Sequence, residues 1–130
     1  MKFLKIKETC LYVNDLERAR GFYHGILDLP VIHSEHNKHL FLRAGESVLL
    51  LFNPEHSRKK TSPPAHYGGG KQHFAFEVSS QSYDDSREEI AKKGIAIIDE
   101  LRWSSGKKSF YFNDPEGNVL EVLPAEGIWD

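Results

Sequence analysis

Apolar and polar residues alternate over residues 3–13, and apolar residues then recur at helical spacing between Leu16 and Ile26. The alternation predicts a strand, and the second pattern predicts an amphipathic helix that Asn14-Asp15 can cap. Three short apolar stretches follow at 31–34, 39–43 and 48–52, separated by turn residues. The order predicted for the first half of the chain is therefore β-α-β-β-β.

The second half repeats this order. An apolar strand is predicted at 74–78, and a helix starting at Ser80 or Ser82 is predicted to run to about Lys93, with Gly94 at the C′ position. Strands at 96–98, 109–112 and 119–123 complete the half. Because the two halves have the same order of elements, the sequence predicts an internal duplication of two βαβββ modules.

The segment between the modules is polar and rich in proline and glycine. Residues 53–72 are therefore predicted to be a linker or a lid, between a first module at 1–52 and a second at 73–130 of one domain, 1–130. Gly70-Lys71 does not form a phosphate loop, because Ala65 stands where the first glycine should be and Gln72 replaces the required Ser or Thr.

Composition narrows the class of protein. A chain of 130 residues with 39% apolar residues is large enough for one folded domain with its own core. The single cysteine, Cys10, excludes an intramolecular disulfide and favours a reducing, cytoplasmic location. The net charge of −2 provides no basic stripe for nucleic acid, and no apolar run is long enough for a membrane span or a signal peptide. A small molecule is the expected partner.

Three polar residues interrupt otherwise apolar strand sequences: Glu8, His73 and Glu121. Each would cost free energy if it were buried without a partner. A divalent cation can satisfy two carboxylates and an imidazole together. The three residues are therefore candidate ligands of one metal ion.

A longer pattern surrounds these three residues. It consists of Glu8-Thr9-Cys10-Leu11-Tyr12-Val13-Asn14-Asp15-Leu16, Phe22-Tyr23, Leu27-Asp28-Leu29, His73-Phe74-Ala75-Phe76, Phe112-Asn113-Asp114-Pro115-Glu116-Gly117-Asn118 and Leu120-Glu121. In this pattern the chain resembles, essentially end to end, the vicinal oxygen chelate superfamily, which includes glyoxalase I, extradiol dioxygenases, methylmalonyl-CoA epimerase, fosfomycin-resistance enzymes and bleomycin-binding proteins.

The resemblance implies an α+β fold in which the two modules curl a mixed sheet into a cup, with the helices outside. Strand parity agrees with this arrangement, because side chains alternate between the two faces. Leu11, Phe74 and Leu120 are expected to face the helices. Glu8, His73 and Glu121 are expected to face the cavity.

Glyoxalase-like members use four metal ligands, and this chain fills three of those positions. The fourth falls on Leu50 by the internal repeat, or on Leu49 if the alignment shifts by one residue. A glyoxalase I reaction would leave Glu8 and Glu121 to share the acid and base roles, whereas extradiol dioxygenases present two histidines and one glutamate. Each comparison is partial, so the reaction type stays open among lyase, isomerase and dioxygenase.

The chemistry common to these relatives is a divalent ion, here Fe, Mn, Zn, Ni or Co, that chelates two neighbouring oxygens of a small substrate. Glu8 or Glu121 would then transfer a proton. The alternative is a metal-free protein that binds or sequesters a small molecule, as bleomycin-resistance proteins do. The resemblance also implies a homodimer.

Further candidates line the expected pocket by parity or by loop position: Cys10, Tyr12, Leu50, His66, Trp103 and Tyr111. Cys10 is expected to be an inert, buried thiol. His66 is either an ordinary loop histidine or a fourth ligand, an acid-base group or a substrate contact. His33, His36 and His39 surround a predicted turn and are expected to be solvated rather than convergent. The basic run Arg58-Lys59-Lys60 is either a solvated loop or a contact for an anionic substrate.

Overall fold

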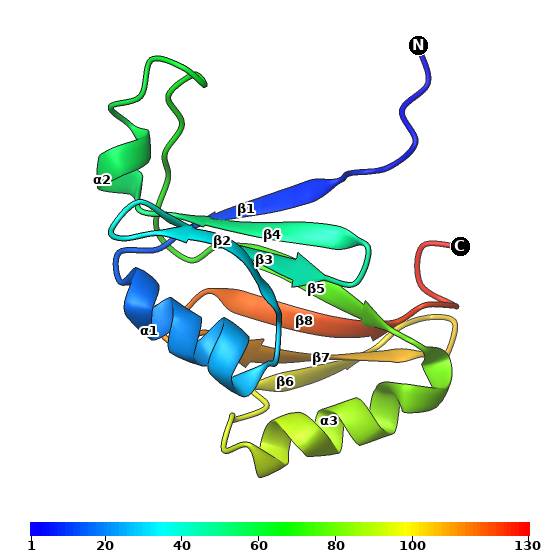
Figure 1. The fold of residues 1–130 in the computed structure, drawn as a ribbon. Helices are drawn as coiled ribbons and strands as arrows, with labels where there is room; N and C mark the ends of the chain where they lie inside the picture. Colours follow the sequence, from blue (N-terminus) through cyan, green and yellow to red (C-terminus); the bar gives the residue numbers. More distant parts are fainter. The chain divides into compact units, whose positions relative to one another are not determined.

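The computed structural model describes all residues, 1–130, and divides into two compact units, Met1–Gly70 and Lys71–Asp130 (Figure 1). Each unit contains one four-stranded sheet. Residues 53–70, which we predicted to be part of a linker or lid, belong to the first unit.

The first unit has the predicted order of elements. They are β1 (Glu8–Tyr12), α1 (Leu16–Arg20) and its π-helical continuation η1 (Gly21–Ile26), β2 (Val31–Glu35), β3 (His39–Ala44), β4 (Ser47–Phe52) and the short α2 (Pro54–Ser57). The strand order in the sheet is β1-β4-β3-β2, with β1 parallel to β4 and the other pairs antiparallel. The carboxylate of Asp15 caps α1 by accepting a hydrogen bond from the Arg18 amide at 2.9 Å, which confirms the predicted start of the helix.

The second unit repeats the topology. Its elements are β5 (His73–Val78), the 3₁₀ turn η2 (Ser80–Ser82), α3 (Tyr83–Lys92), β6 (Asp99–Arg102), β7 (Lys108–Asn113) and β8 (Val119–Pro124). The strand order is β5-β8-β7-β6, again with one parallel pair, β5 with β8. The predicted α+β fold with two βαβββ modules is therefore confirmed.

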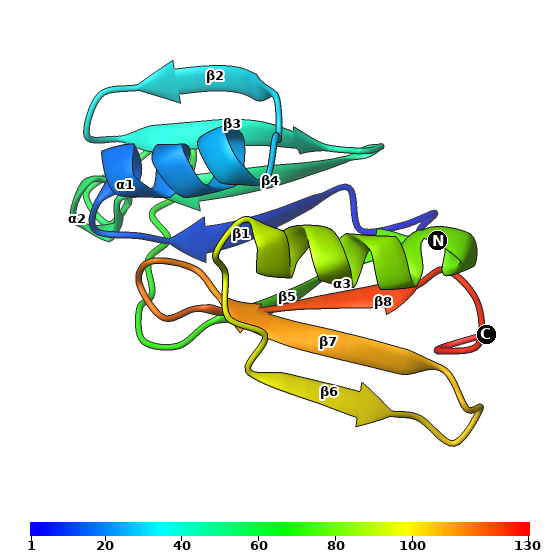
Figure 2. The same ribbon diagram turned by 90° about the horizontal axis from the view of Figure 1, so that it is seen from below.

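Each sheet has one apolar face that packs under its helix. In the first unit the buried side chains on this face come from β1, β3 and β4, and they include Leu11, Leu42 and Leu51. In the second unit α3 packs on β8 (Figure 2). Phe110 lies against Tyr83 of α3, with ring centroids 5.6 Å apart, and Leu120 of β8 is fully buried. Because side chains alternate along a strand, the polar candidates lie on the opposite face of each sheet.

The parallel strand pair has the same register in both units, so each residue of one pair has a counterpart in the other. Cys10 lies opposite Leu50 in the β1–β4 pair, as Ala75 lies opposite Glu121 in the β5–β8 pair. Leu50 is therefore the counterpart of Glu121, and the alternative assignment to Leu49 is excluded. Leu49 is buried on the helix-facing side of the sheet.

A buried polar network ties the turn before β8 to the start of β5. Asp114 is 5% exposed and accepts hydrogen bonds from the amides of Glu116 and Asn118, both at 2.9 Å. The side chain of Asn118, 1% exposed, donates to Asp114 at 2.8 Å and accepts from the backbone amide of Gln72 at 3.1 Å. The Val119 amide in turn donates to the Gln72 carbonyl at 2.8 Å. This network fixes where β5 and β8 begin relative to each other.

Three local features differ from the sequence prediction. The strand predicted at 96–98 lies instead at Asp99–Arg102. Of residues 96–98, only Ile98 is hydrogen-bonded to β7, through its amide to the Tyr111 carbonyl. The side chain that caps the turn before α3 is that of Ser79, not Ser80 or Ser82. The helix α2 was missed, although Asn53 as the N-cap and Pro54 at the first helical position are a start signal.

No helix in the structure is long and apolar enough to cross a membrane.

We predict that Asn118→Ala lowers the free energy of unfolding by about 2–3 kcal/mol, because it removes the buried side-chain hydrogen bonds to Asp114 and to the Gln72 amide. Urea denaturation measures the effect. Asn113→Ala, at the exposed last position of β7, directly before the turn, is the matched control and should change stability by less than about 0.5 kcal/mol. Equal losses in the two variants would contradict this role of Asn118.

Candidate metal centre and its surroundings

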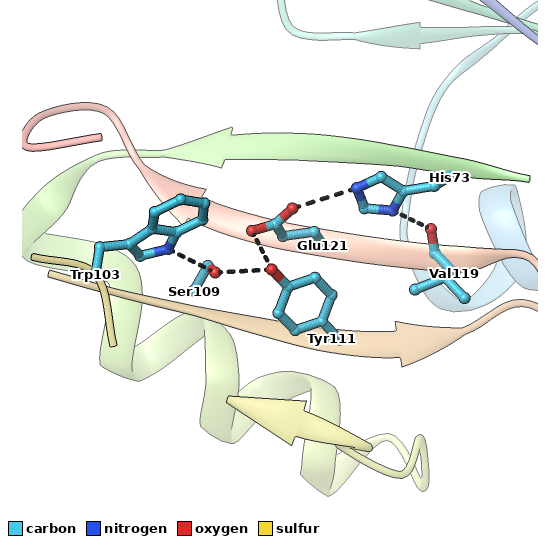
Figure 3. Close-up of polar contacts among 6 residues, drawn as sticks. All are labelled: His73, Trp103, Ser109, Tyr111, Val119 and Glu121. Carbon is cyan, nitrogen blue, oxygen red and sulfur yellow. Dashed lines mark hydrogen bonds and ion pairs between the residues drawn. The ribbon is translucent and has the colours of Figure 1, made fainter. Parts of the chain in front are cut away.

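The second unit brings together His73 and Glu121, which lie 48 positions apart in the sequence, because β5 and β8 are paired. The imidazole Nε2 of His73 lies 3.4 Å from Oε2 of Glu121 (Figure 3). The Glu121 side chain is buried, with 8% exposed, whereas that of His73 is 52% exposed. No Lys or Arg side chain pairs with Glu121. A buried carboxylate thus faces an accessible imidazole.

Hydrogen bonding determines which atoms of this pair remain available. The Nδ1 of His73 lies 2.8 Å from the Val119 carbonyl oxygen, which can only accept, so Nδ1 carries a proton. In the neutral imidazole Nε2 then presents a lone pair to a carboxylate oxygen that is also an acceptor. Only a cation, either a proton or a metal ion, makes that contact favourable. A histidine that donates its other ring N–H to a backbone carbonyl is the usual arrangement of a metal ligand.

Glu121 is oriented by the strand beside it. Tyr111 lies opposite Glu121 in the β7–β8 pair, and its hydroxyl donates to Oε1 at 2.9 Å. Burial raises the pKa of Tyr111, and the adjacent carboxylate adds to the increase, so the phenol keeps the proton that it donates. The Tyr111 ring also lies against the His73 ring, with centroids 6.3 Å apart. Tyr111 therefore contacts both candidate ligands.

Glu8, the third candidate ligand, lies at the first position of β1 in the first unit. Its side chain is exposed and makes no hydrogen bond or ion pair. Within neither unit do three His, Cys, Asp or Glu side chains converge on one point. Cys10, two residues along β1, is exposed, so our expectation of a buried thiol was wrong.

The corresponding face of the first unit carries aromatic groups in place of a carboxylate. Leu50 is paired with Phe41, as Glu121 is paired with Tyr111. Burial raises the pKa of Tyr12 to about 12, and its hydroxyl lies 2.8 Å from Nδ1 of His66. The His66 ring packs edge-on against Phe52, with centroids 4.6 Å apart. His66 is thus not a free loop histidine but part of this aromatic face.

Two of the three histidines that we expected to be solvated do converge. Nδ1 of His33 lies 2.8 Å from Nε2 of His39, across the β2–β3 hairpin. His39 is 9% exposed and stacks on Phe41 at 4.2 Å, and its own Nδ1 is buried without a hydrogen-bond partner. The spacing rule that we applied concerns helices, whereas cross-strand neighbours in a hairpin are set by register. His33 and His36 are exposed, as predicted, and only His39 is buried.

Burial, together with the neighbouring His33, lowers the pKa of His39; Lys60 and His56 add to this effect and Glu35 opposes it. The unfolded chain therefore takes up a proton near pH 6.5 that the folded chain does not. We predict that stability from this group is constant above about pH 6.5 and falls below it, by at most about 1.4 kcal/mol per pH unit.

The variant His39→Phe, which keeps a ring on Phe41, should lose this component of the pH dependence. Urea denaturation between about pH 5 and 8 measures it. His36→Asn, at an exposed position in the same hairpin, is the control and should follow the parent profile. Parallel profiles for the parent and His39→Phe would contradict the assignment.

Comparisons with known proteins agree with the fold. A family model for the Glyoxalase/Bleomycin resistance protein/Dioxygenase superfamily matches residues 5–122. The crystal structure of lactoylglutathione lyase from Agrobacterium tumefaciens superposes with a TM-score of 0.88 at 30% identity, covering 93% of each chain.

Two further relatives are similar in sequence over most of their length. Glutathione transferase FosA of Serratia marcescens is 28% identical over 120 residues, which cover 90% of this chain and 78% of the relative. Metallothiol transferase FosB of Lysinibacillus sphaericus is 25% identical over 122 residues, which cover 93% of this chain and 82% of the relative.

Proposed function

The chain belongs to the glyoxalase/bleomycin resistance protein/dioxygenase superfamily, and on that premise we propose that it is a metal-dependent enzyme acting on a small molecule with two neighbouring oxygen atoms. His73, Glu121 and Glu8 would hold the metal, which we expect to be Fe, Mn, Zn, Ni or Co. The observation that carries the proposal is the facing pair of acceptor atoms, His73 Nε2 and Glu121 Oε2, 3.4 Å apart.

The donor set fits a divalent cation of borderline hardness. One imidazole and two carboxylates match the preferences of these metals, and the anchored Nδ1 of His73 holds its ring in the orientation that leaves Nε2 free. A cation bound there would supply Lewis acidity, stabilising negative charge on the chelated oxygens of the substrate.

The two carboxylates are suited to different roles. Tyr111 donates a hydrogen bond to one oxygen of the buried Glu121, which holds that carboxylate in place as a ligand. The carboxylate of Glu8 is exposed and makes no contact of its own, so it is free to turn. We therefore assign proton transfer to Glu8 and a fixed ligand role to Glu121.

The relatives suggest the substrate class. The names of all three contain a thiol or its conjugate: glutathione, metallothiol and lactoylglutathione. We propose that one substrate of this protein is a thiol, free or already joined to an oxygen-bearing small molecule. In the basic run, Arg58 is paired with Glu55, whereas the ammonium of Lys60 has no carboxylate partner and lies 5.7 Å from the Phe52 ring centre. Lys60 is available to an anionic substrate group.

We further propose that the protein forms a homodimer, as its resemblance to this superfamily implies.

We predict that the untagged protein binds a divalent metal near-stoichiometrically, and that His73→Ala and Glu121→Ala each abolish this binding because they remove a ligand atom. Glu8→Gln, which keeps an oxygen donor but loses the charge and the base, should retain most of the metal and lose turnover. Metal content measured by inductively coupled plasma mass spectrometry after reconstitution tests all three.

His36→Ala, at an exposed position in the first unit, is the control and should retain the metal. A parent protein that takes up no metal under any reconstitution condition would overturn the proposal and favour a metal-free binding protein. Full metal retention in His73→Ala would overturn the ligand assignment alone.

A further inference from the structure

A chain of hydrogen bonds extends from Glu121 away from His73 (Figure 3). Tyr111 donates to Glu121 at 2.9 Å, the hydroxyl of Ser109 lies 3.4 Å from that of Tyr111, and the indole N–H of Trp103 lies 3.0 Å from the Ser109 oxygen. Ser109 is fully buried, and Tyr111 and Trp103 are half-buried. These hydrogen bonds are therefore mostly shielded from solvent.

The direction of every bond in this chain is determined by chemistry. An indole N–H can only donate, so Ser109 must accept from Trp103. The Tyr111 hydroxyl donates to Oε1 of Glu121, so its proton points to the carboxylate. The remaining proton, that of Ser109, then points to the Tyr111 oxygen. All three donors are thus aligned toward the carboxylate, and such aligned bonds polarise and strengthen one another.

The duplicated module shows that these polar groups are not required by the fold. At the position of Glu121 the first unit has Leu50, and at the position of Tyr111 it has Phe41. The same strand pairing forms there without a carboxylate and without the hydroxyl beside it. The tyrosine hydroxyl occurs in the module that has a carboxylate to receive it.

Trp103, at the end of the hydrogen-bond chain remote from Glu121, is anchored in a loop. Trp103 follows β6, and its backbone is held in the turn by a 2.8 Å hydrogen bond to the Lys107 carbonyl. Its ring packs edge-on against Trp129 near the C-terminus, with centroids 5.2 Å apart. The indole N–H is therefore fixed in direction by packing on a side remote from His73.

We propose that Tyr111, Ser109 and Trp103 are positioning residues that hold the Glu121 carboxylate in place, binding Oε1 so that Oε2 is directed toward the metal. This inference rests on the proposed function, since it concerns the ligand that we assign to the metal. It predicts that metal affinity depends on groups that do not touch the metal.

The test compares the metal affinity of Tyr111→Phe, Ser109→Ala and Trp103→Phe with that of the parent by competitive titration of Mn²⁺, Co²⁺ and Zn²⁺. Tyr111→Phe should weaken binding about 10–100-fold, the usual effect of removing a group that orients a ligand. Ser109→Ala and Trp103→Phe should cause smaller losses, because the 3.4 Å link between Ser109 and Tyr111 is long for O–H···O. The visible spectrum of bound Co²⁺ should change in Tyr111→Phe.

Tyr83→Phe is the matched control. It removes another tyrosine hydroxyl of the same unit, one that donates to the Glu100 carboxylate at 3.3 Å on the helix side of the sheet. Its metal affinity should equal that of the parent, even where thermal unfolding shows lower stability. A general loss of stability would weaken metal binding in Tyr83→Phe as well and would overturn the positioning role.

A double-mutant cycle separates this inference from the proposed function. In a Glu121→Gln background, Tyr111→Phe should cause no further loss of affinity, because the carboxylate that it orients is gone. If Glu121→Gln weakens metal binding but Tyr111→Phe stays within about twofold of the parent, the positioning role is wrong and the metal site stands. If Glu121→Gln binds metal like the parent, the proposed ligand set fails first.

Discussion

The parallel pairing of β5 with β8 in a single register is the constraint on which the candidate centre depends. It places Val119 beside His73, where its carbonyl holds the imidazole, and it sets Glu121 two positions further along the same face. A slip of one residue would turn Glu121 toward the helix and bury its charge in the apolar core. The Asp114–Asn118–Gln72 network prevents that slip by joining the two strand starts through buried hydrogen bonds. The turn that contains Asp114 and Asn118 is therefore structural, although it lies beside the site.

The two modules show how one topology supports different surfaces. Both have a parallel pair joined through a helix and a hairpin, and both bury an apolar face under that helix. On the opposite face, one module carries Glu121 with Tyr111 beside it, and the other carries Leu50 with Phe41 beside it. The fold fixes these positions in space, and the side chains decide the chemistry. The second unit thus carries the two candidate ligands His73 and Glu121, whereas the same face of the first unit is largely aromatic.

Burial affects the ionisable groups of the two units in opposite ways. In the second unit the buried carboxylate of Glu121 receives a hydrogen bond from Tyr111 and has Nε2 of His73 at 3.4 Å, but no Lys or Arg side chain pairs with it. In the first unit the imidazole of His39 is buried beside a second histidine and near Lys60, which favours its neutral form and lowers its pKa. In our proposal the second unit binds a cation, whereas the first unit disfavours an additional positive charge at His39.

The sequence by itself determined the duplicated modules, nearly all the strands and the face on which Glu8, His73 and Glu121 lie, because these follow from alternation and repetition along the chain. It did not determine contacts between residues brought together by strand pairing. The His33–His39 contact and the bonds from Trp103 to Ser109 and from Tyr111 to Glu121 depend on register and on the turn after β6. Register also decided between Leu50 and Leu49 as the counterpart of Glu121. Alternation gives the face of a side chain, but its neighbours on that face are set only when the strands pair.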